Sequence, residues 1–150
     1  MSKSGVLLPV RICLALSLVV GLVILAFDGL LWFDNPRNGH ATALIVFSVI
    51  QAFLLGFSFL RFQEAKRMIL FWSILYLVLL LLNPLTAPSI DMPIEVFTLY
   101  LMGFFPVSST PQFSCPFLCP PFLITYDLLI VLQIILVATL LRNRRKQQAI

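Results

Sequence analysis

Long apolar runs, separated by short polar or proline-bearing stretches, dominate the chain. Four runs carry few charged residues, and each is long enough to cross a hydrocarbon core, for which about 20 helical residues suffice. The pattern predicts four membrane-spanning helices at about 6–27, 41–60, 68–85 and 123–141. A membrane β-barrel would show short alternating segments instead, whereas these runs are continuous.

The first run has two interpretations, because a secretory signal peptide also begins with an apolar segment. Its apolar part is too long for a signal core, and no small-residue cleavage pattern follows it. We therefore predict a retained helix that ends at Asp28-Gly29. The residues from Leu30 to Phe33 form an aromatic patch typical of a membrane interface.

The composition differs from that of a soluble domain. The 150 residues are 61% hydrophobic and 11% charged, and the mean hydropathy is +1.06. Soluble domains carry roughly 25% charged residues. We expect one all-α integral membrane domain over 1–150, a bundle of four transmembrane helices with an outer loop at 86–122 and a basic tail at 142–150.

The basic residues fix the predicted orientation. Every Lys and Arg except Arg37 falls on one side of a four-span arrangement: Lys3, Arg11, Arg61, Lys66, Arg67, Arg142, Arg144, Arg145 and Lys146. Cytoplasmic segments retain Lys and Arg, so we expect both termini in the cytoplasm, with a bacterial plasma membrane as the setting. The net charge of +4 is then a topology signal and gives no indication of nucleic-acid binding.

Four polar residues lie near the middle of their own spans: Ser17, Gln51, Tyr76 and Gln133. Polar side chains at one depth are costly in lipid, so we expect them to face the bundle interior. One interpretation is hydrogen bonding between helices, and the other is a site for a polar substrate or a quinone. We favour the first, because no charge accompanies this layer.

Small residues recur at a spacing of four on the first two spans. Ser17 and Gly21 form one such pair, and Ser48, Ala52 and Gly56 form a longer stripe. This spacing lets helix backbones approach closely.

Asp127 is the one acidic residue inside a predicted span, about one turn from the outer surface. An intramembrane carboxylate is a functional candidate, but water reaches this depth. We favour an interfacial carboxylate paired with Asn83, Thr125 or Arg37. Arg11 lies near the other surface, where its side chain can reach the interface, and we assign it no function.

The outer loop has two parts. Asp91 as N-cap, Pro93 in the first turn and Gly103 as terminator predict a short helix from Met92 to Met102 that lies in the outer interface, with a re-entrant helix as the alternative. The second part, from Pro106 to Pro121, is too rich in proline to stay helical for long.

Two of the three cysteines, Cys115 and Cys119, frame the sequence C-P-F-L-C-P in this loop. Outer compartments are oxidising, so a disulfide between them is the simplest expectation. Cys13 lies in the first span near the other surface, and we interpret it as a small apolar filler.

The C-P-F-L-C-P stretch resembles the C-P-x-x-C-P copper-binding stretch of Sco-type copper chaperones. The resemblance implies copper bound by Cys115, Cys119 and His40, the single histidine. It covers six residues, and the thioredoxin-like domain of that family is absent. The architecture also resembles the disulfide-generating quinone oxidoreductases of the bacterial inner membrane, but the first outer loop, 28–40, has no cysteine for their thiol relay.

Several function classes are excluded. One histidine rules out a bis-histidine haem, and neither a phosphate-binding glycine loop nor a nucleophile elbow occurs. The leading hypothesis is a non-catalytic accessory, assembly or interaction subunit, which contacts lipid and protein partners or copies of itself and requires no cofactor. The alternative is a thiol-redox or copper-handling membrane protein that acts through the outer-loop cysteines.

Overall fold

The computed structural model describes residues 4–33, 39–90, 93–101 and 119–148, and side chains over the inner parts of these ranges. Within them every residue except Arg61 and Pro93 is helical: α1 (Ser4–Phe33), α2 (Gly39–Leu60), α3 (Phe62–Leu82), the 3₁₀ helix η1 (Asn83–Ile90), α4 (Ile94–Leu101) and α5 (Cys119–Gln148). Four of these helices are long and apolar enough to cross a membrane: α1, α2, α3 and α5. The four apolar helices expected from the sequence are therefore present.

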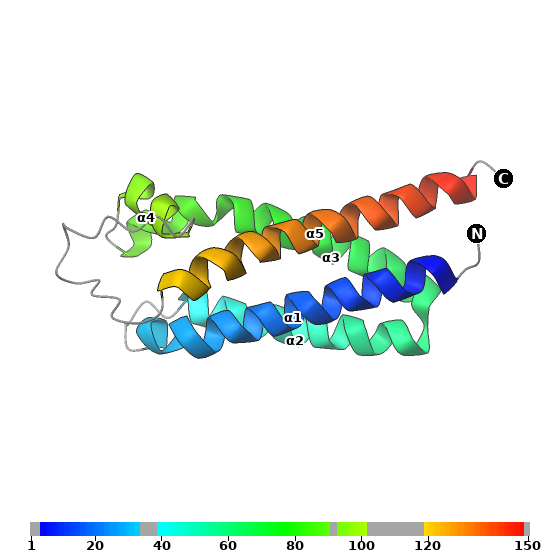
Figure 1. Ribbon diagram of the computed structural model, residues 1–150, viewed down its shortest axis with the longest axis horizontal. Coiled ribbons are helices and arrows are strands. Elements are labelled where there is room, and N and C mark those ends of the chain that lie inside the picture. The colour runs from blue at the N-terminus through cyan, green and yellow to red at the C-terminus, as the bar shows by residue number, and fades with distance from the viewer. Residues whose placement is uncertain (1–3, 34–38, 91–92, 102–118, 149–150) are drawn as a thin grey trace.

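The long helices form a four-membered bundle. Helix α1 packs against α2 and α5, and α3 packs against the same two helices, so the contacts close a ring. Both termini lie at one end, and α4 lies at the other end, where it packs against η1 and α5 (Figure 1). Each long helix therefore presents one face to the ring and another to the outside.

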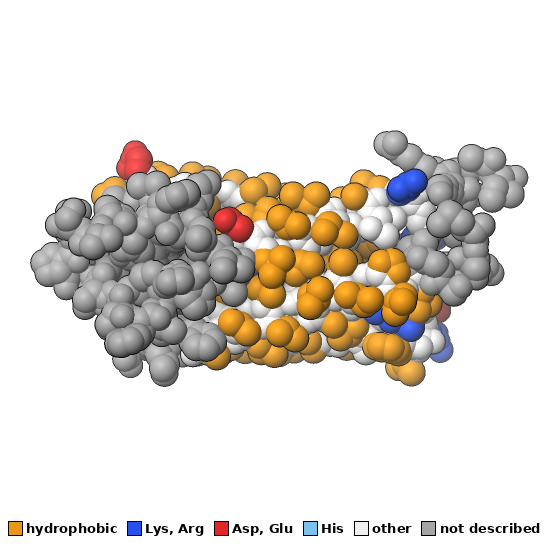
Figure 2. Space-filling model, viewed as in Figure 1, with side chains coloured by type: hydrophobic (Ala, Val, Ile, Leu, Met, Phe, Trp, Pro, Cys, Tyr) orange, Lys and Arg blue, Asp and Glu red, His pale blue; other side chains and the backbone are white. Residues whose placement is uncertain are grey.

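The outer surface is banded by side-chain type. Figure 2 shows apolar side chains around the middle of the bundle and Lys and Arg at the end that carries the termini, which we call the basic end. Asp and Glu lie toward the other end, except Glu64, which pairs with Arg61 at the basic end. Helices that are apolar on all sides suit an apolar surrounding.

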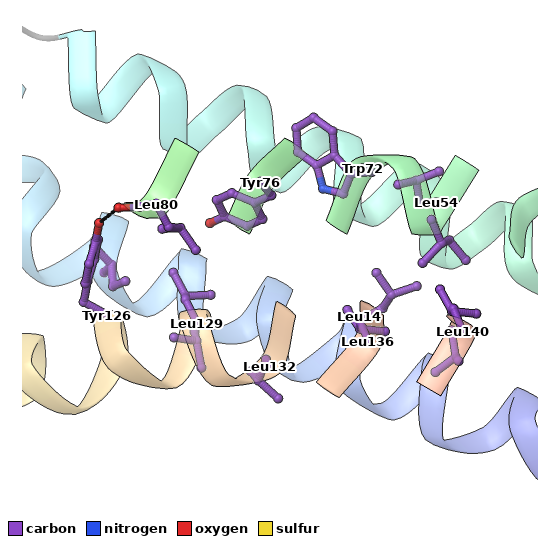
Figure 3. Close-up of a cluster of buried hydrophobic side chains, with 14 of the residues drawn as sticks. Leu14, Leu54, Trp72, Tyr76, Leu80, Tyr126, Leu129, Leu132, Leu136 and Leu140 are labelled. Carbon is purple, nitrogen blue, oxygen red and sulfur yellow. Dashed lines mark hydrogen bonds between the residues drawn. The ribbon is translucent and has the colours of Figure 1, made fainter. Parts of the chain in front are cut away.

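A stripe of side chains at a spacing of three and four residues fills the interior. On α3 the buried residues are Ala65, Ile69, Trp72, Ser73, Tyr76 and Leu80. On α5 the buried leucines Leu129, Leu132, Leu136 and Leu140 follow the same spacing, and Leu136 and Leu140 lie near Leu14 of α1 (Figure 3). This periodicity places one face of each helix in a common core.

The predicted end of the first helix at Asp28-Gly29 is wrong, since α1 continues to Phe33. A glycine ends a helix where the chain reverses into a left-handed conformation. Here the apolar residues after Gly29 extend the helix. The residues predicted as an interfacial patch are therefore its last turn.

The predicted spans at 41–60 and 68–85 leave residues 61–67 as a link between them, but the link in the structure is much shorter. Only Arg61 separates α2 from α3, with φ −139° and ψ 70°. Residues 62–67 form the first turns of α3, because Gln, Glu, Ala, Lys and Arg favour helix. Glu64 complements the helix dipole in the first turn, and it pairs with Arg61 at 3.4 Å.

Helix α4 lies where the sequence predicts a short helix. The Phe97 amide donates to the carbonyl of Pro93 at 3.0 Å, and the Phe97 side chain is buried. The predicted cap Asp91 and terminator Gly103 lie outside the described residues.

Two predicted boundaries of the last span also shift. Helix α5 begins at Cys119, so the prolines at 120 and 121 lie in its first turn, where a missing N–H breaks no helical hydrogen bond. The predicted start of the last span near residue 123 is therefore wrong by about one turn. At its other end α5 continues through Arg142 to Gln148, so most of the predicted tail is helical.

Candidate functional site: a polar layer inside the bundle

Two contacts fix how α1 and α2 align. Arg11 hydrogen bonds to Ser58, and a Cβ placed on Gly21 would lie 3.5 Å from Ser48 Oγ. The helices are antiparallel, and the interval from Arg11 to Gly21 equals that from Ser48 to Ser58. The same register places Ser17 level with residues 51–52.

A third contact aligns α3 with α5. The Tyr126 hydroxyl donates a hydrogen bond to the Leu80 carbonyl (Figure 3). Seven residues farther along α5 is Gln133, and seven residues back along α3 is Ser73. Because α3 and α5 are antiparallel, both steps of seven residues move about 10.5 Å in the same direction along the bundle, at 1.5 Å per residue. Ser73 and Gln133 therefore lie at one level.

The two alignments meet at Gln133, whose Nε2 donates to Ser17 Oγ at 2.7 Å. One residue from each long helix thus reaches the same level: Ser17, Gln51, Ser73 and Gln133. We call these four side chains the polar layer. Their exposed fractions are 0%, 2%, 0% and 0%, so all four point into the bundle.

Tyr76 is buried with the predicted layer but lies about one turn from it, toward α4. Its ring packs edge-on against Phe47 of α2 at 5.0 Å and lies 5.8 Å from Trp72. Phe47 also meets Trp72 edge-on at 5.5 Å. Such pairs add to area burial, so this aromatic group joins α2 to α3.

Sequence reasoning missed Ser73 for a geometric reason. Residues 68–85 were expected to form the third span, which centred the layer near Tyr76. Because α3 begins at Phe62, its midpoint lies near residue 72. Correct helix bounds would have pointed to Ser73.

Three buried polar atoms lack a hydrogen-bond partner among the described residues: Trp72 Nε1, Ser73 Oγ and Gln133 Oε1. Gln133 is thus half satisfied, since its amide nitrogen donates to Ser17 while its oxygen accepts nothing. Buried polar atoms without a partner are rare, because each loses its hydration without compensation.

Arg11 has a structural role that the sequence did not indicate. Its Nη2 donates to the Ser58 carbonyl at 2.6 Å, and its Nε approaches Ser58 Oγ at 3.3 Å. The guanidinium also lies 4.1 Å from the centre of the Phe59 ring. The last carbonyls of a helix have no partner inside it, and a positive charge is favourable there. Arg11 of α1 therefore caps α2.

The small-residue stripe on α2 is divided between two environments. Ser48 lies inside the ring, against Gly21 of α1. Ala52 and Gly56 are exposed, and nothing lies within 4 Å of a Cβ built on Gly56. Among the described residues the stripe therefore packs inside the ring at Ser48, whereas α2 turns Ala52 and Gly56 away from the ring.

Asp127 is exposed near the start of α5, the end of that helix opposite its basic residues. The side chain of Asn83, one of its expected partners, accepts a hydrogen bond from Thr86 Oγ1 at 3.4 Å. Arg37 and the side chain of Thr125 lie outside the described part of the chain, so those two pairings stay predictions.

The outer-loop cysteine site is not covered by the described side chains. Cys115 lies outside the described residues, as do the side chains of Cys119 and His40. The disulfide and the copper site therefore stay predictions. Cys13 is half-buried, carries no disulfide and packs against the core, in keeping with a filler role.

Comparison of the chain with protein-family models, curated proteins and solved structures finds no match. The residues and their geometry alone carry the functional proposal.

Proposed function

We propose that this chain is a four-span integral membrane protein of a bacterial plasma membrane, with both termini cytoplasmic, and that it acts as a non-catalytic accessory or assembly subunit. Both termini lie at the basic end of the bundle, which supports a cytoplasmic position for both. The apolar band around the bundle supports residence in lipid. The subunit binds its partner through the outward face of α2.

The observation that carries the proposal is the exposed position of Ala52 and Gly56. A glycine inside a helix costs about 1 kcal/mol relative to alanine. Within this chain Gly56 brings no close packing in return, because open space surrounds it. On membrane helices, small residues at this spacing allow a second helix to approach.

Neighbouring residues complete a helix-wide face around this pair. Val49, Phe53 and Leu60 are exposed on the same side of α2, at successive intervals of four and seven residues. Phe53 stacks on Phe57 with ring centroids 5.9 Å apart. The face thus carries small residues beside aromatic rings, which fits an apolar transmembrane helix of another protein.

Site-specific photo-crosslinking in native membranes tests the proposal. A photoreactive residue at Phe53 is expected to give an adduct with a different membrane protein, and the additional change Gly56→Leu is expected to abolish it. Phe71 of α3 is the matched control, since it is equally apolar and 70% exposed but lies on another helix.

Three results are informative. An adduct that needs Gly56 and is absent from position 71 supports a partner on α2. A self-adduct makes the partner a second copy, and adducts with lipid alone refute the docking face. The thiol-redox or copper alternative rests on Cys115, Cys119 and His40, and no described contact favours it.

A further inference from the structure

Two basic side chains continue the buried faces of α3 and α5 beyond the end of the core. On α3, half-buried Lys66 lies three residues before Ile69 and seven before Ser73, both fully buried. On α5, exposed Arg144 lies four residues after the fully buried Leu140. Side chains at these spacings share one face of a helix. Both cations therefore lie on the faces that α3 and α5 turn toward the ring.

The register of α3 and α5 brings these two cations to the same end of the contact between the helices. Tyr126 bonds to Leu80, and fourteen residues from each of them toward the basic end lie Leu140 and Lys66. Arg144 is about one turn farther along α5. The helices are in direct contact, and the two positive charges are close enough to repel each other. We call Lys66 and Arg144 the cation pair.

Negative charge is scarce around the cation pair. Among the described side chains, Glu64 is the one carboxylate at the basic end, since Glu95 belongs to α4 and Asp127 to the start of α5. Glu64 pairs with Arg61 at 3.4 Å. Side chains two residues apart on a helix, such as those at positions 64 and 66, do not face each other. Adjacent like charges in such surroundings favour an anion that contacts both.

Apolar side chains adjoin the cation pair on the side of the apolar band. Met68, two residues after Lys66, is 45% exposed, and Leu141, three residues before Arg144, is 39% exposed. A ligand at this position meets positive charge at one end and apolar surface at the other. In membrane proteins, basic residues between helices on the cytoplasmic side bind anionic lipid headgroups.

We propose that the cation pair binds the phosphate of an anionic phospholipid at the cytoplasmic end of the contact between α3 and α5, with the acyl chains against the apolar band. Lys66 supplies a compact positive charge, and the Arg144 guanidinium can donate two parallel hydrogen bonds to a phosphate. The site rests on the membrane placement proposed above and is independent of the docking face on α2.

Native mass spectrometry of the full-length protein in a non-ionic detergent tests the proposal. Phosphatidylglycerol is added in increasing amounts, and the fraction of protein that carries one lipid gives an apparent dissociation constant. Phosphatidylcholine, whose headgroup has no net charge, is the matched lipid. We expect phosphatidylglycerol to bind more tightly than phosphatidylcholine. We also expect that inorganic phosphate does not displace it, because phosphate lacks acyl chains.

Variants then separate the cation pair from the general charge of the basic end. The double change Lys66→Gln and Arg144→Gln should weaken phosphatidylglycerol binding roughly 30-fold, the effect of two cations near an anionic surface. The double change Arg67→Gln and Arg142→Gln is the matched control, since it removes two charges from exposed positions on the same two helices. We expect a much smaller loss from it.

Three results would overturn the proposal. Equal affinity of the wild-type protein for both lipids would refute a phosphate site. Equal losses in the two double variants would show that the overall charge of the basic end attracts the lipid. Displacement by inorganic phosphate would make free phosphate the ligand. If the first double variant fails to fold, the single change Arg144→Gln is compared with Arg142→Gln instead. No other protein is present, so the absence of a partner on α2 would leave these results unchanged.

Discussion

Replacing Arg11 by methionine should weaken the contact between α1 and α2. Methionine keeps the apolar stem of arginine but removes the guanidinium. The Ser58 carbonyl then loses its 2.6 Å hydrogen bond, and Phe59 loses the charge above its ring. Ser58 Oγ keeps its own bond to the Leu55 carbonyl at 2.7 Å, so the change is confined to the end of α2.

The size of the effect follows from these contacts. A hydrogen bond to a charged group contributes about 1.5–3 kcal/mol. A cation at a helix C-terminus adds about 0.3–1 kcal/mol, and a cation above an aromatic ring about 0.5–1 kcal/mol at exposed sites. One guanidinium makes all three contacts, so the terms overlap, and we expect a loss of about 2–3 kcal/mol in total.

Equilibrium unfolding in mixed micelles with increasing dodecyl sulfate measures this loss, with helicity as the readout. Arg67→Met is the matched control, since it removes the same charge from an exposed position at the same end. Its loss should stay within about 0.5 kcal/mol, as for ordinary surface changes. Equal losses in both variants, or an unchanged Arg11→Met protein, would show that Arg11 does not cap α2.

Three further outcomes are expected. Gln133→Leu removes the bond to Ser17 and should cost no more than about 2 kcal/mol in the same unfolding assay, since hydrogen bonds in membranes are weak; a loss above that range would contradict the assigned role. Reporter fusions after residue 65 should indicate the cytoplasm and fusions near residue 110 the outside, because of the Lys and Arg distribution; an outward C-terminus would refute four spans. Protein isolated without reductant should carry a disulfide between Cys115 and Cys119, detected by alkylation and mass spectrometry; two freely alkylated thiols would contradict it.

The sequence predicts the number and approximate position of the long helices well, because length and hydropathy are enough for that. It predicts their ends poorly. Asp28-Gly29 and the residues after Arg61 are polar, and polar residues between apolar runs usually indicate a helix boundary. Asp28-Gly29 nevertheless lies inside α1, and the residues after Arg61 form the first turns of α3. Helix propensity and the local capping geometry decide such ends, and neither is visible in a hydropathy profile.

The orientation of each helix about its own axis is harder to predict. Ser48 and Gly56 belong to one stripe, but the first lies inside the ring and the second outside. A soluble helix shows its buried face through the contrast between apolar and polar positions. Here both faces are apolar, so that contrast is missing and the small residues alone do not reveal the rotation.

Three polar contacts fix the relative heights and rotations of the helices, which the apolar surfaces leave open. Arg11 with Ser58 joins α1 to α2, Gln133 with Ser17 joins α5 to α1, and Tyr126 with Leu80 joins α5 to α3. Each contact connects a different pair of neighbours and therefore fixes one relative height and one relative rotation. Apolar packing between such helices can shift by a residue at small cost, whereas a shift here would leave a buried donor or acceptor unpaired. The polar groups thus contribute more to selecting one arrangement of the bundle than to its total stability.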